Sequence, residues 1–193
     1  MRSPMKKLIA RAFRKFYPLE MITPPLPRKA IVIGAPHTSM MDAVLMLMAF
    51  WYAERPMKFM VKNQAADLPI IGSLIRRLGG VSIERSKHHG VVEQVIAKAN
   101  AADDFLLVIA PKGTRAQRKY WKSGFYHIAK GADIPVVYGF IDTSTKQYGW
   151  EDRAHTLTGN MRTDMDDIRA FYAGKLGIHP ELTSEPRLQG EEE

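Results

Sequence analysis

Cysteine is absent from this sequence of 193 residues. The chain therefore has no disulfide, no thiolate nucleophile and no cysteine-ligated metal site. A reducing cytoplasm is compatible with this composition. Any chemistry that the protein performs must come from hydroxyl, imidazole, carboxylate or basic side chains.

The sequence also lacks a hydrophobic run long enough to cross a membrane. Its longest uninterrupted apolar stretch, residues 43–53, falls short of the roughly 20 residues that a membrane-spanning helix needs. Near the N-terminus, Arg11, Arg14 and Lys15 interrupt the place where a signal peptide has its apolar segment, and no small-residue cleavage site follows. We therefore expect a retained N-terminal segment and no transmembrane span.

Acidic residues are outnumbered by basic ones, with 20 Asp and Glu against 28 Lys and Arg, which gives a formal net charge of +8. This excess predicts an acidic partner, either nucleic acid, anionic lipid or a phosphorylated substrate. The sequence contains no recognised nucleic-acid-binding motif, and its aromatic residues do not alternate with a basic stripe as base-stacking platforms would. We therefore expect no nucleic-acid partner.

The basic residues near the N-terminus belong to an amphipathic pattern. Apolar residues recur there at steps of three and four, which gathers them on one helical face: Met5, Leu8, Ile9, Ala12, Phe13 and Phe16. Such a helix, bordered by cations and no acids, suits an anionic membrane surface, although periodicity alone also allows docking onto the protein's own core. We assign residues 1–22 to a membrane-surface helix, followed by a stiff proline-rich linker at 23–27.

Beyond the linker, short apolar runs alternate with helical patterns, which is typical of an α/β domain. The expected strands are residues 30–33, 58–61, 81–83, 105–110 and 135–140, and the expected helices are residues 39–53, 70–78, 91–101 and 164–173. The chain is long enough for one sizeable core, and its length requires no second domain. We place this domain at residues 28–180 and expect an acidic, flexible tail at 181–193.

The first candidate site follows the first expected strand, where His37 precedes a helix and Asp42 lies on its first turn. If the chain folds back, Asp42 accepts a hydrogen bond from one imidazole nitrogen and leaves the other nitrogen free to act as a base. The same stretch also fits a capping box, with Ser39 at the N-cap and Asp42 satisfying its backbone amide. Taken alone, these residues favour the capping box over the catalytic pair.

A second candidate site follows the expected strand 105–110 and consists of Lys112, Gly113, Thr114 and Arg115. Loops at the carboxyl ends of strands are where α/β sheets bind ligands. Glycine lets the backbone approach an anion, while ammonium, hydroxyl and guanidinium groups offer donors to a phosphate. The alternative is an ordinary basic turn. Arg85, at the end of another expected strand, is a further candidate for the same cleft.

In this order, the blocks resemble the motifs of the glycerolipid acyltransferase superfamily, in particular the bacterial 1-acylglycerol-3-phosphate and lysophospholipid acyltransferases. His37 and Asp42 match the H-x-x-x-x-D block, and Arg85 matches a block that ends in arginine. The P-E-G-T-R block reads Pro111-Lys112-Gly113-Thr114-Arg115 in this chain, and residues 134–138 resemble a fourth block. The similarity covers roughly residues 30–142. It implies a glycerol-3-phosphate acyltransferase-like α/β fold, with a mixed sheet flanked by helices.

The resemblance also implies an O-acyltransferase in which His37, oriented by Asp42, deprotonates the hydroxyl of a lysophosphatidate-like or other lysophospholipid acceptor. That hydroxyl attacks the thioester of acyl-CoA or acyl carrier protein, which act as co-substrates, and no cofactor or metal is implied. Arg85 and the loop of residues 112–115 hold the acceptor phosphate. The protein is expected to act peripherally on the cytoplasmic face of the cell membrane, in an oligomeric state that the sequence leaves open.

The chain departs from the family pattern at Lys112, where the family has glutamate. A cation beside a phosphate tightens ground-state binding, but it raises the rate only if the transition state gains more. Lys112 has a second interpretation, as the partner of an acid such as Glu84. The substitution leaves open a non-catalytic or altered-specificity lipid-binding homologue as the alternative to an enzyme.

Overall fold

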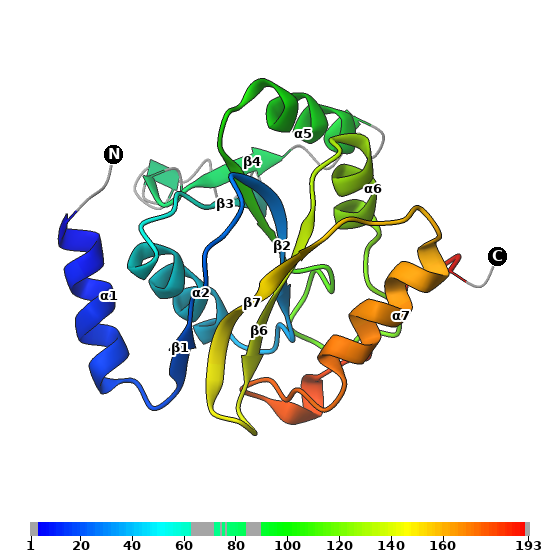
Figure 1. Cartoon of the computed structure of the whole chain (residues 1–193). Coiled ribbons are helices and arrows are strands. Elements are labelled where there is room, and N and C mark those ends of the chain that lie inside the picture. Colours follow the sequence, from blue (N-terminus) through cyan, green and yellow to red (C-terminus); the bar gives the residue numbers. More distant parts are fainter. Residues whose placement is uncertain (1–3, 63–71, 74, 76, 84–89, 192–193) are drawn as a thin grey trace.

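The computed structural model describes residues 4–62, 72–73, 75, 77–83 and 90–191. Its strands form a seven-stranded sheet in the order β1-β7-β6-β2-β5-β3-β4 (Figure 1). They are β1 (Glu20–Ile22), β2 (Lys29–Ala35), β3 (Lys58–Lys62), β4 (Gly80–Ile83), β5 (Phe105–Ile109), β6 (Val136–Asp142) and β7 (Gln147–His155). Neighbouring strands are parallel except for β6 and β7, which are antiparallel. The expected mixed sheet is confirmed.

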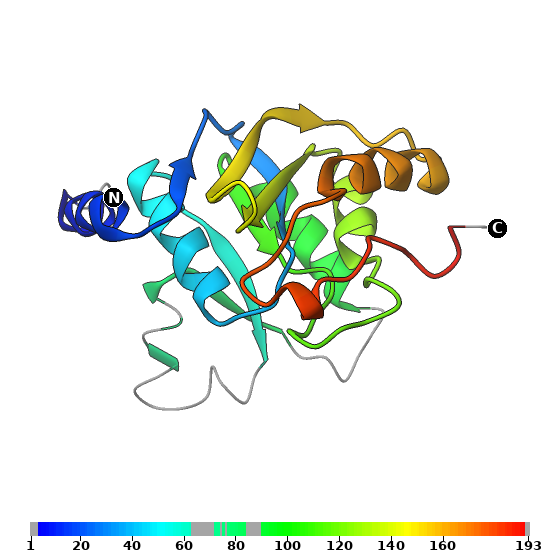
Figure 2. The same cartoon turned by 90° about the horizontal axis from the view of Figure 1, so that it is seen from below.

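Helices cover both faces of this sheet. They are α1 (Pro4–Phe16), α2 (Met41–Tyr52), α5 (Gly90–Ala101), α6 (Gly124–Gly131), α7 (Met161–Tyr172) and the short 3-10 helix η1 (Pro180–Leu182). Helices α1 and α2 lie on one side, and α5, α6 and α7 lie on the other (Figures 1 and 2). The residues of β2 alternate between the two cores, with Ile31 facing one and Val32 the other. Burial on both faces explains why its sequence is continuously apolar.

Most predicted elements are present, with ends shifted by a few residues. The predicted helix 39–53 begins at Met41 and ends at Tyr52, and the predicted helix 164–173 is the longer α7. In the predicted helix 70–78, residues 72, 73, 75 and 77 are helical, while 70, 71, 74 and 76 lie outside the described residues. Strands β1 and β7 and helix α6 were not predicted. In β7, charged residues at 151–153, of which 152 and 153 are exposed, follow the buried Trp150 and interrupt the apolar pattern of the strand.

Helix α1 docks on α2 through the face opposite to its apolar stripe. Ala10 is fully buried there, the guanidinium of Arg14 lies 4.9 Å from the ring centroid of Tyr52, and Lys7 pairs with Glu54. Most of the stripe is exposed, namely Met5, Leu8, Ile9, Ala12 and Phe16, whereas Phe13 is half-buried against the core. The alternatives of docking and surface exposure are therefore both realised, on different faces of one helix. No described helix has the length and apolar character needed to cross a membrane.

The segment expected as a flexible acidic tail packs against the domain in its described part. Leu188 forms a parallel bridge with Trp121 and is only 1% exposed. The carboxylate of Glu191 pairs with the guanidinium of Arg169 at 2.7 Å. Between η1 and residue 191 the chain therefore covers the sheet edge at which the parallel strands β2 and β5 end, the edge that faces the viewer in Figure 2.

Asp164 fixes the start of α7. Its buried carboxylate accepts hydrogen bonds from both Thr158 groups, the backbone N–H and the side-chain hydroxyl, and from the N–H of Gly159 and the hydroxyl of Tyr126. Burial acts to raise the pKa of Asp164, but these hydrogen bonds outweigh it and leave the pKa below its usual value. The charged form is therefore favoured by folding, and its stabilisation is present above the unfolded-state pKa and lost as pH falls through the lower folded-state pKa.

We predict that Asp164→Asn lowers the free energy of unfolding by about 1–3 kcal/mol at neutral pH, because buried donors lose their charged acceptor. In urea denaturation, the difference from the wild type should narrow as the buffer approaches pH ~3, where the wild type also loses its carboxylate. Asp167→Asn, on the exposed face of the same helix, is the control. A difference that is independent of pH would contradict the role of the charge.

Candidate active site

The loop between β2 and α2 carries the first candidate pair. His37 Nδ1 lies 3.4 Å from Asp42 Oδ2, and the two side chains are 24% and 5% exposed. The distance exceeds that of a well-formed hydrogen bond, as is common for catalytic pairs without bound substrate. Because Nδ1 faces the carboxylate, the other ring nitrogen, Nε2, is the one left to meet a substrate. The structure thus brings together the two residues predicted from the sequence.

The same carboxylate oxygen also caps the helix. Asp42 Oδ2 accepts hydrogen bonds from the backbone N–H of Thr38 at 2.6 Å and of Ser39 at 2.8 Å. The N-cap is Met40 rather than Ser39, whose hydroxyl accepts from the N–H of Met41. The predicted hydrogen bond from the N–H of Ser39 to Asp42 therefore forms, whereas the predicted N-cap role of Ser39 does not. They coexist with the His37 contact, so the cap and the catalytic pair are compatible.

His37 and Asp42 line a cavity of about 450 Å³. Most of the other side chains that line it are apolar, among them Met40, Met46, Leu47, Met57, Phe59, Met60, Val108 and Phe140. Methionine side chains are flexible and adapt to irregular apolar ligands. The cavity therefore combines a histidine–aspartate pair with walls suited to a hydrocarbon group.

The loop after β5 contributes to this cavity through one residue of the predicted set. Gly113 lines the cavity and has a φ of +67°, which favours glycine, and its N–H closes a turn onto the carbonyl of Ala110. Thr114 is half-buried and Arg115 is exposed beside it. Arg85, the remaining predicted ligand, lies outside the described residues.

Lys112, predicted to bind a phosphate, is buried and donates hydrogen bonds to backbone carbonyls. Its side chain is 5% exposed, and its ammonium donates to the carbonyl of Leu182 at 2.7 Å and, less closely, to that of Arg115 at 3.3 Å. Burial lowers the pKa of Lys112, although the negative charge of Asp42 acts in the opposite direction. The ammonium is thus engaged in tying its loop to η1. Glu84, the alternative partner, lies outside the described residues.

Lys122 is a residue that the sequence motifs did not indicate. Its backbone N–H donates to the carbonyl of Pro111, which brings its exposed side chain over Gly113. A Cβ atom built on Gly113 would lie 3.1 Å from Lys122 Cε and 3.4 Å from Nζ. The loop therefore has a cation next to its glycine, supplied by Lys122 rather than by Lys112. Residues 121–126 resemble a segment of lysophospholipid acyltransferases, but only the backbone pairing with Pro111 places Lys122 beside the glycine.

A brace formed by residues 177–182 contacts both candidate loops. The N–H of His179 donates to Thr38 Oγ1 at 3.1 Å, next to His37, and Leu182 accepts from Lys112. Gly177 packs so closely that a Cβ atom there would lie 2.5 Å from Thr38 Oγ1. The brace therefore holds the histidine loop and the glycine loop against one another. In the described part of the chain, no three His, Asp or Glu side chains are grouped to share a metal ion.

Comparison with known proteins points in one direction. The model of the Acyltransferase family matches residues 16–138, which include both candidate loops. The chain is 26% identical over 104 residues to the lysophosphatidylcholine acyltransferase of Drosophila melanogaster, covering 50% of this chain and 19% of that protein. Its fold is similar to that of the 1-acyl-sn-glycerophosphate (LPA) acyltransferase PlsC from Thermotoga maritima, with a TM-score of 0.51 and 21% identity, over 73% of this chain and 58% of that one. The chain thus spans less than two thirds of either relative.

We predict that Lys112→Met lowers the free energy of unfolding by about 1–3 kcal/mol, because the carbonyls of Leu182 and Arg115 lose a charged donor while the apolar stem is kept. Urea denaturation followed by tryptophan fluorescence measures the change. Lys122→Met, which removes an exposed ammonium nearby, should stay within about 0.5 kcal/mol of the wild type. Equal stability of the two variants would contradict the tie to η1.

Proposed function

This chain belongs to the acyltransferase family, and we propose that it moves a fatty acyl group from a thioester donor to a hydroxyl group of a lysophospholipid at a membrane surface. The observation that carries this proposal is the His37–Asp42 pair in the wall of an apolar cavity. The names of the two relatives, both acyltransferases acting on lysolipids, support the choice of acceptor.

The proposed reaction uses the pair as a general base and its support. His37 Nε2 takes the proton of the acceptor hydroxyl as the oxygen attacks the thioester carbonyl. Asp42, facing Nδ1, stabilises the imidazolium that forms and keeps the ring in the productive tautomer. Collapse of the tetrahedral intermediate forms the ester and expels the thiolate, which takes the proton from His37. The donor class, acyl-CoA or acyl carrier protein, needs neither a metal nor a cofactor in this scheme.

The apolar cavity and the glycine loop bind different substrates in this proposal. The apolar cavity takes the acyl chain, which places the thioester beside His37. The acceptor phosphate lies at the glycine loop, where Arg115 and Lys122 supply exposed cations that pair with phosphate oxygens. Thr114 and, by family resemblance, Arg85 belong to the same site. Lys112 contributes by holding the loop in place, so its replacement of glutamate is compatible with an active enzyme.

We predict that His37→Ala reduces acyl transfer by at least about a hundredfold, and that Asp42→Asn does so as well because the tautomer is no longer fixed. Transfer is measured with radiolabelled lysophosphatidate and acyl-CoA or acyl carrier protein. Circular dichroism and the melting temperature should show that His37→Ala is folded. Near-normal turnover in that folded variant would exclude the mechanism, and a wild type that binds lipid without transferring acyl groups would support the non-catalytic alternative.

The exposed face of α1 is the proposed membrane contact. Leu8 and Phe16 are 66% and 81% exposed, although both would be buried in a purely structural helix. Arg11 and Lys15 are exposed beside this face, in position to meet anionic headgroups while the apolar side chains enter the lipid interface. We propose peripheral attachment in this way to the cytoplasmic leaflet, where anionic lipid is concentrated.

We predict that the double variant Leu8→Ser/Phe16→Ser binds anionic vesicles at least about tenfold more weakly, because it removes most of the insertable apolar area. Its melting temperature should be unchanged, since both side chains are exposed. Sedimentation with vesicles containing phosphatidylglycerol provides the measurement, and raised salt should weaken wild-type binding. Leu176→Ser, an exposed apolar residue beyond α7, is the control. Vesicle binding that is unaffected in the double variant would reject this face as the contact.

A further inference from the structure

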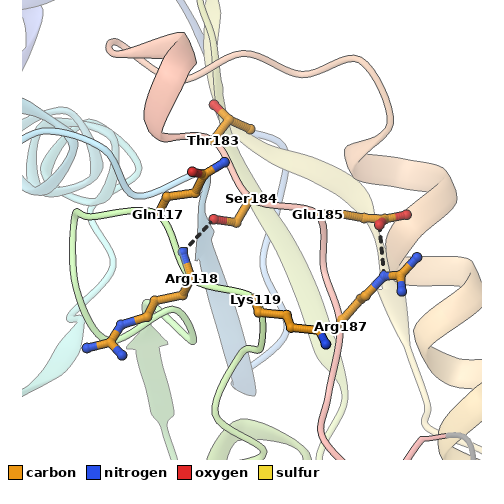
Figure 3. Close-up of a pocket in the computed structure, with 7 residues that line it drawn as sticks. All are labelled: Gln117, Arg118, Lys119, Thr183, Ser184, Glu185 and Arg187. Atoms are coloured by element: carbon orange, nitrogen blue, oxygen red, sulfur yellow. Dashed lines mark hydrogen bonds and ion pairs between the residues drawn. The ribbon is translucent and has the colours of Figure 1, made fainter.

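A second pocket of about 450 Å³ lies apart from the His37 cavity, between a loop and the C-terminal segment (Figure 3). It is lined by Gln117, Arg118, Lys119, Thr183, Ser184, Glu185 and Arg187. None of these side chains is apolar, in contrast to the walls of the His37 cavity. The pocket therefore suits a polar ligand and offers nothing to an acyl chain.

The charge of this pocket is positive. Its lining has three cations, Arg118, Lys119 and Arg187, against one acid. That acid, Glu185, accepts a hydrogen bond from Arg187 Nε at 2.8 Å, which leaves Arg118 and Lys119 without an acidic neighbour in the lining. The sequence has no Asp or Glu between Asp104 and Asp133, so part of the basic excess of the chain lies here. Such a site attracts a ligand with several negative charges.

The two walls of the pocket are joined by hydrogen bonds that backbone N–H groups donate. The N–H of Arg118 donates to Ser184 Oγ at 3.0 Å, and the N–H of Trp121 donates to the carbonyl of Arg187 at 2.7 Å. The Lys119 side chain extends toward Arg187, whose guanidinium points to Glu185, while the Arg118 side chain extends to the opposite side (Figure 3). The cations therefore stand on a fixed frame, which reduces the entropy lost when an anion binds.

The position of the pocket relates it to the candidate active site. An intermediate pocket of about 240 Å³ shares Thr183, Ser184 and Glu185 with the basic pocket. The same intermediate pocket shares Ala35 and Pro36, the residues before His37, with the apolar cavity. The order across the surface is thus apolar cavity, mixed pocket, basic pocket. An acyl-CoA molecule has this order of chemistry, from acyl chain through pantetheine arm to phosphorylated nucleotide.

We propose that the basic pocket binds the phosphorylated nucleotide of coenzyme A while the attached acyl chain occupies the His37 cavity. The inference rests on the proposed acyl transfer and names its donor. The volume of the pocket falls within the roughly 300–1,000 Å³ of small-molecule sites, whereas a carrier protein needs a broad interface rather than a pocket. The acceptor phosphate has its own cations at the glycine loop, so the basic pocket is a second, separate anion site.

Direct binding to the full chain tests the proposal independently of turnover. Isothermal titration calorimetry with coenzyme A should show binding to the wild type, and adenosine 3′,5′-bisphosphate, the detached anionic end, should compete with it. Arg118→Ser and Lys119→Ser should each weaken coenzyme A binding about tenfold, the usual scale for a lost charge-assisted hydrogen bond. Lys98→Ser, which removes an exposed cation from α5, should bind as the wild type does. In kinetics, the KM for acyl-CoA should rise in the pocket variants relative to Lys98→Ser.

The outcomes separate this site from the proposed function. Coenzyme A affinities of Arg118→Ser and Lys119→Ser equal to that of Lys98→Ser would overturn the site, even if the wild type transfers acyl groups. If these variants lose coenzyme A binding and the wild type transfers no acyl group, the proposed coenzyme A site stands and the proposed acyl transfer is rejected. Transfer from acyl carrier protein with no coenzyme A binding would overturn the proposal in favour of the protein donor. If these two variants bind anionic vesicles more weakly than the wild type but bind coenzyme A equally well, the pocket binds lipid headgroups. That result would also overturn the proposed coenzyme A site.

Discussion

The position of one carboxylate oxygen governs the candidate site. Asp42 Oδ2 accepts hydrogen bonds from the N–H groups of Thr38 and Ser39 and faces Nδ1 of His37. The first two contacts end the loop and start α2, and the third orients the imidazole. A capped helix and an aligned base are therefore consequences of the same interaction. Because Asp42 is buried on the first turn of a helix packed against the sheet, the base inherits the rigidity of the fold.

Helix α1 reverses the usual arrangement of an amphipathic helix. Such helices normally turn their apolar stripe to the protein core, whereas here the stripe faces outward. The docked face is made of Ala10 together with the stems and charges of Lys7 and Arg14. Long basic side chains can cover an apolar surface while their charges find partners, so the domain holds the helix with only Ala10 and the half-buried Phe13 as apolar contacts from it.

The sequence predicts the strands in which burial on both faces decides the pattern of residues. Strands β2, β5 and β6 are buried on both faces, so their runs are apolar throughout and the strands could be predicted, as could the positions of His37 and Asp42 at the end of β2. The sequence could not reveal β1, whose three residues carry too short a pattern, or β7, in which only part of the strand is buried. The roles of Lys112 and Lys122 depend on contacts with Leu182 and Pro111, which are not their neighbours in the sequence. Such partners follow from tertiary packing, and no local pattern encodes them.

The brace at residues 177–182 is synthesised later than the segments that it contacts. It follows every described strand in the sequence, so a ribosome releases it after the residues of those strands have been made. A nascent chain can form the hydrophobic cores around β2, β5 and β6 while Thr38 and Lys112 still lack the partners that the brace provides. Synthesis therefore supplies the residues of the sheet before it supplies the groups that brace the site.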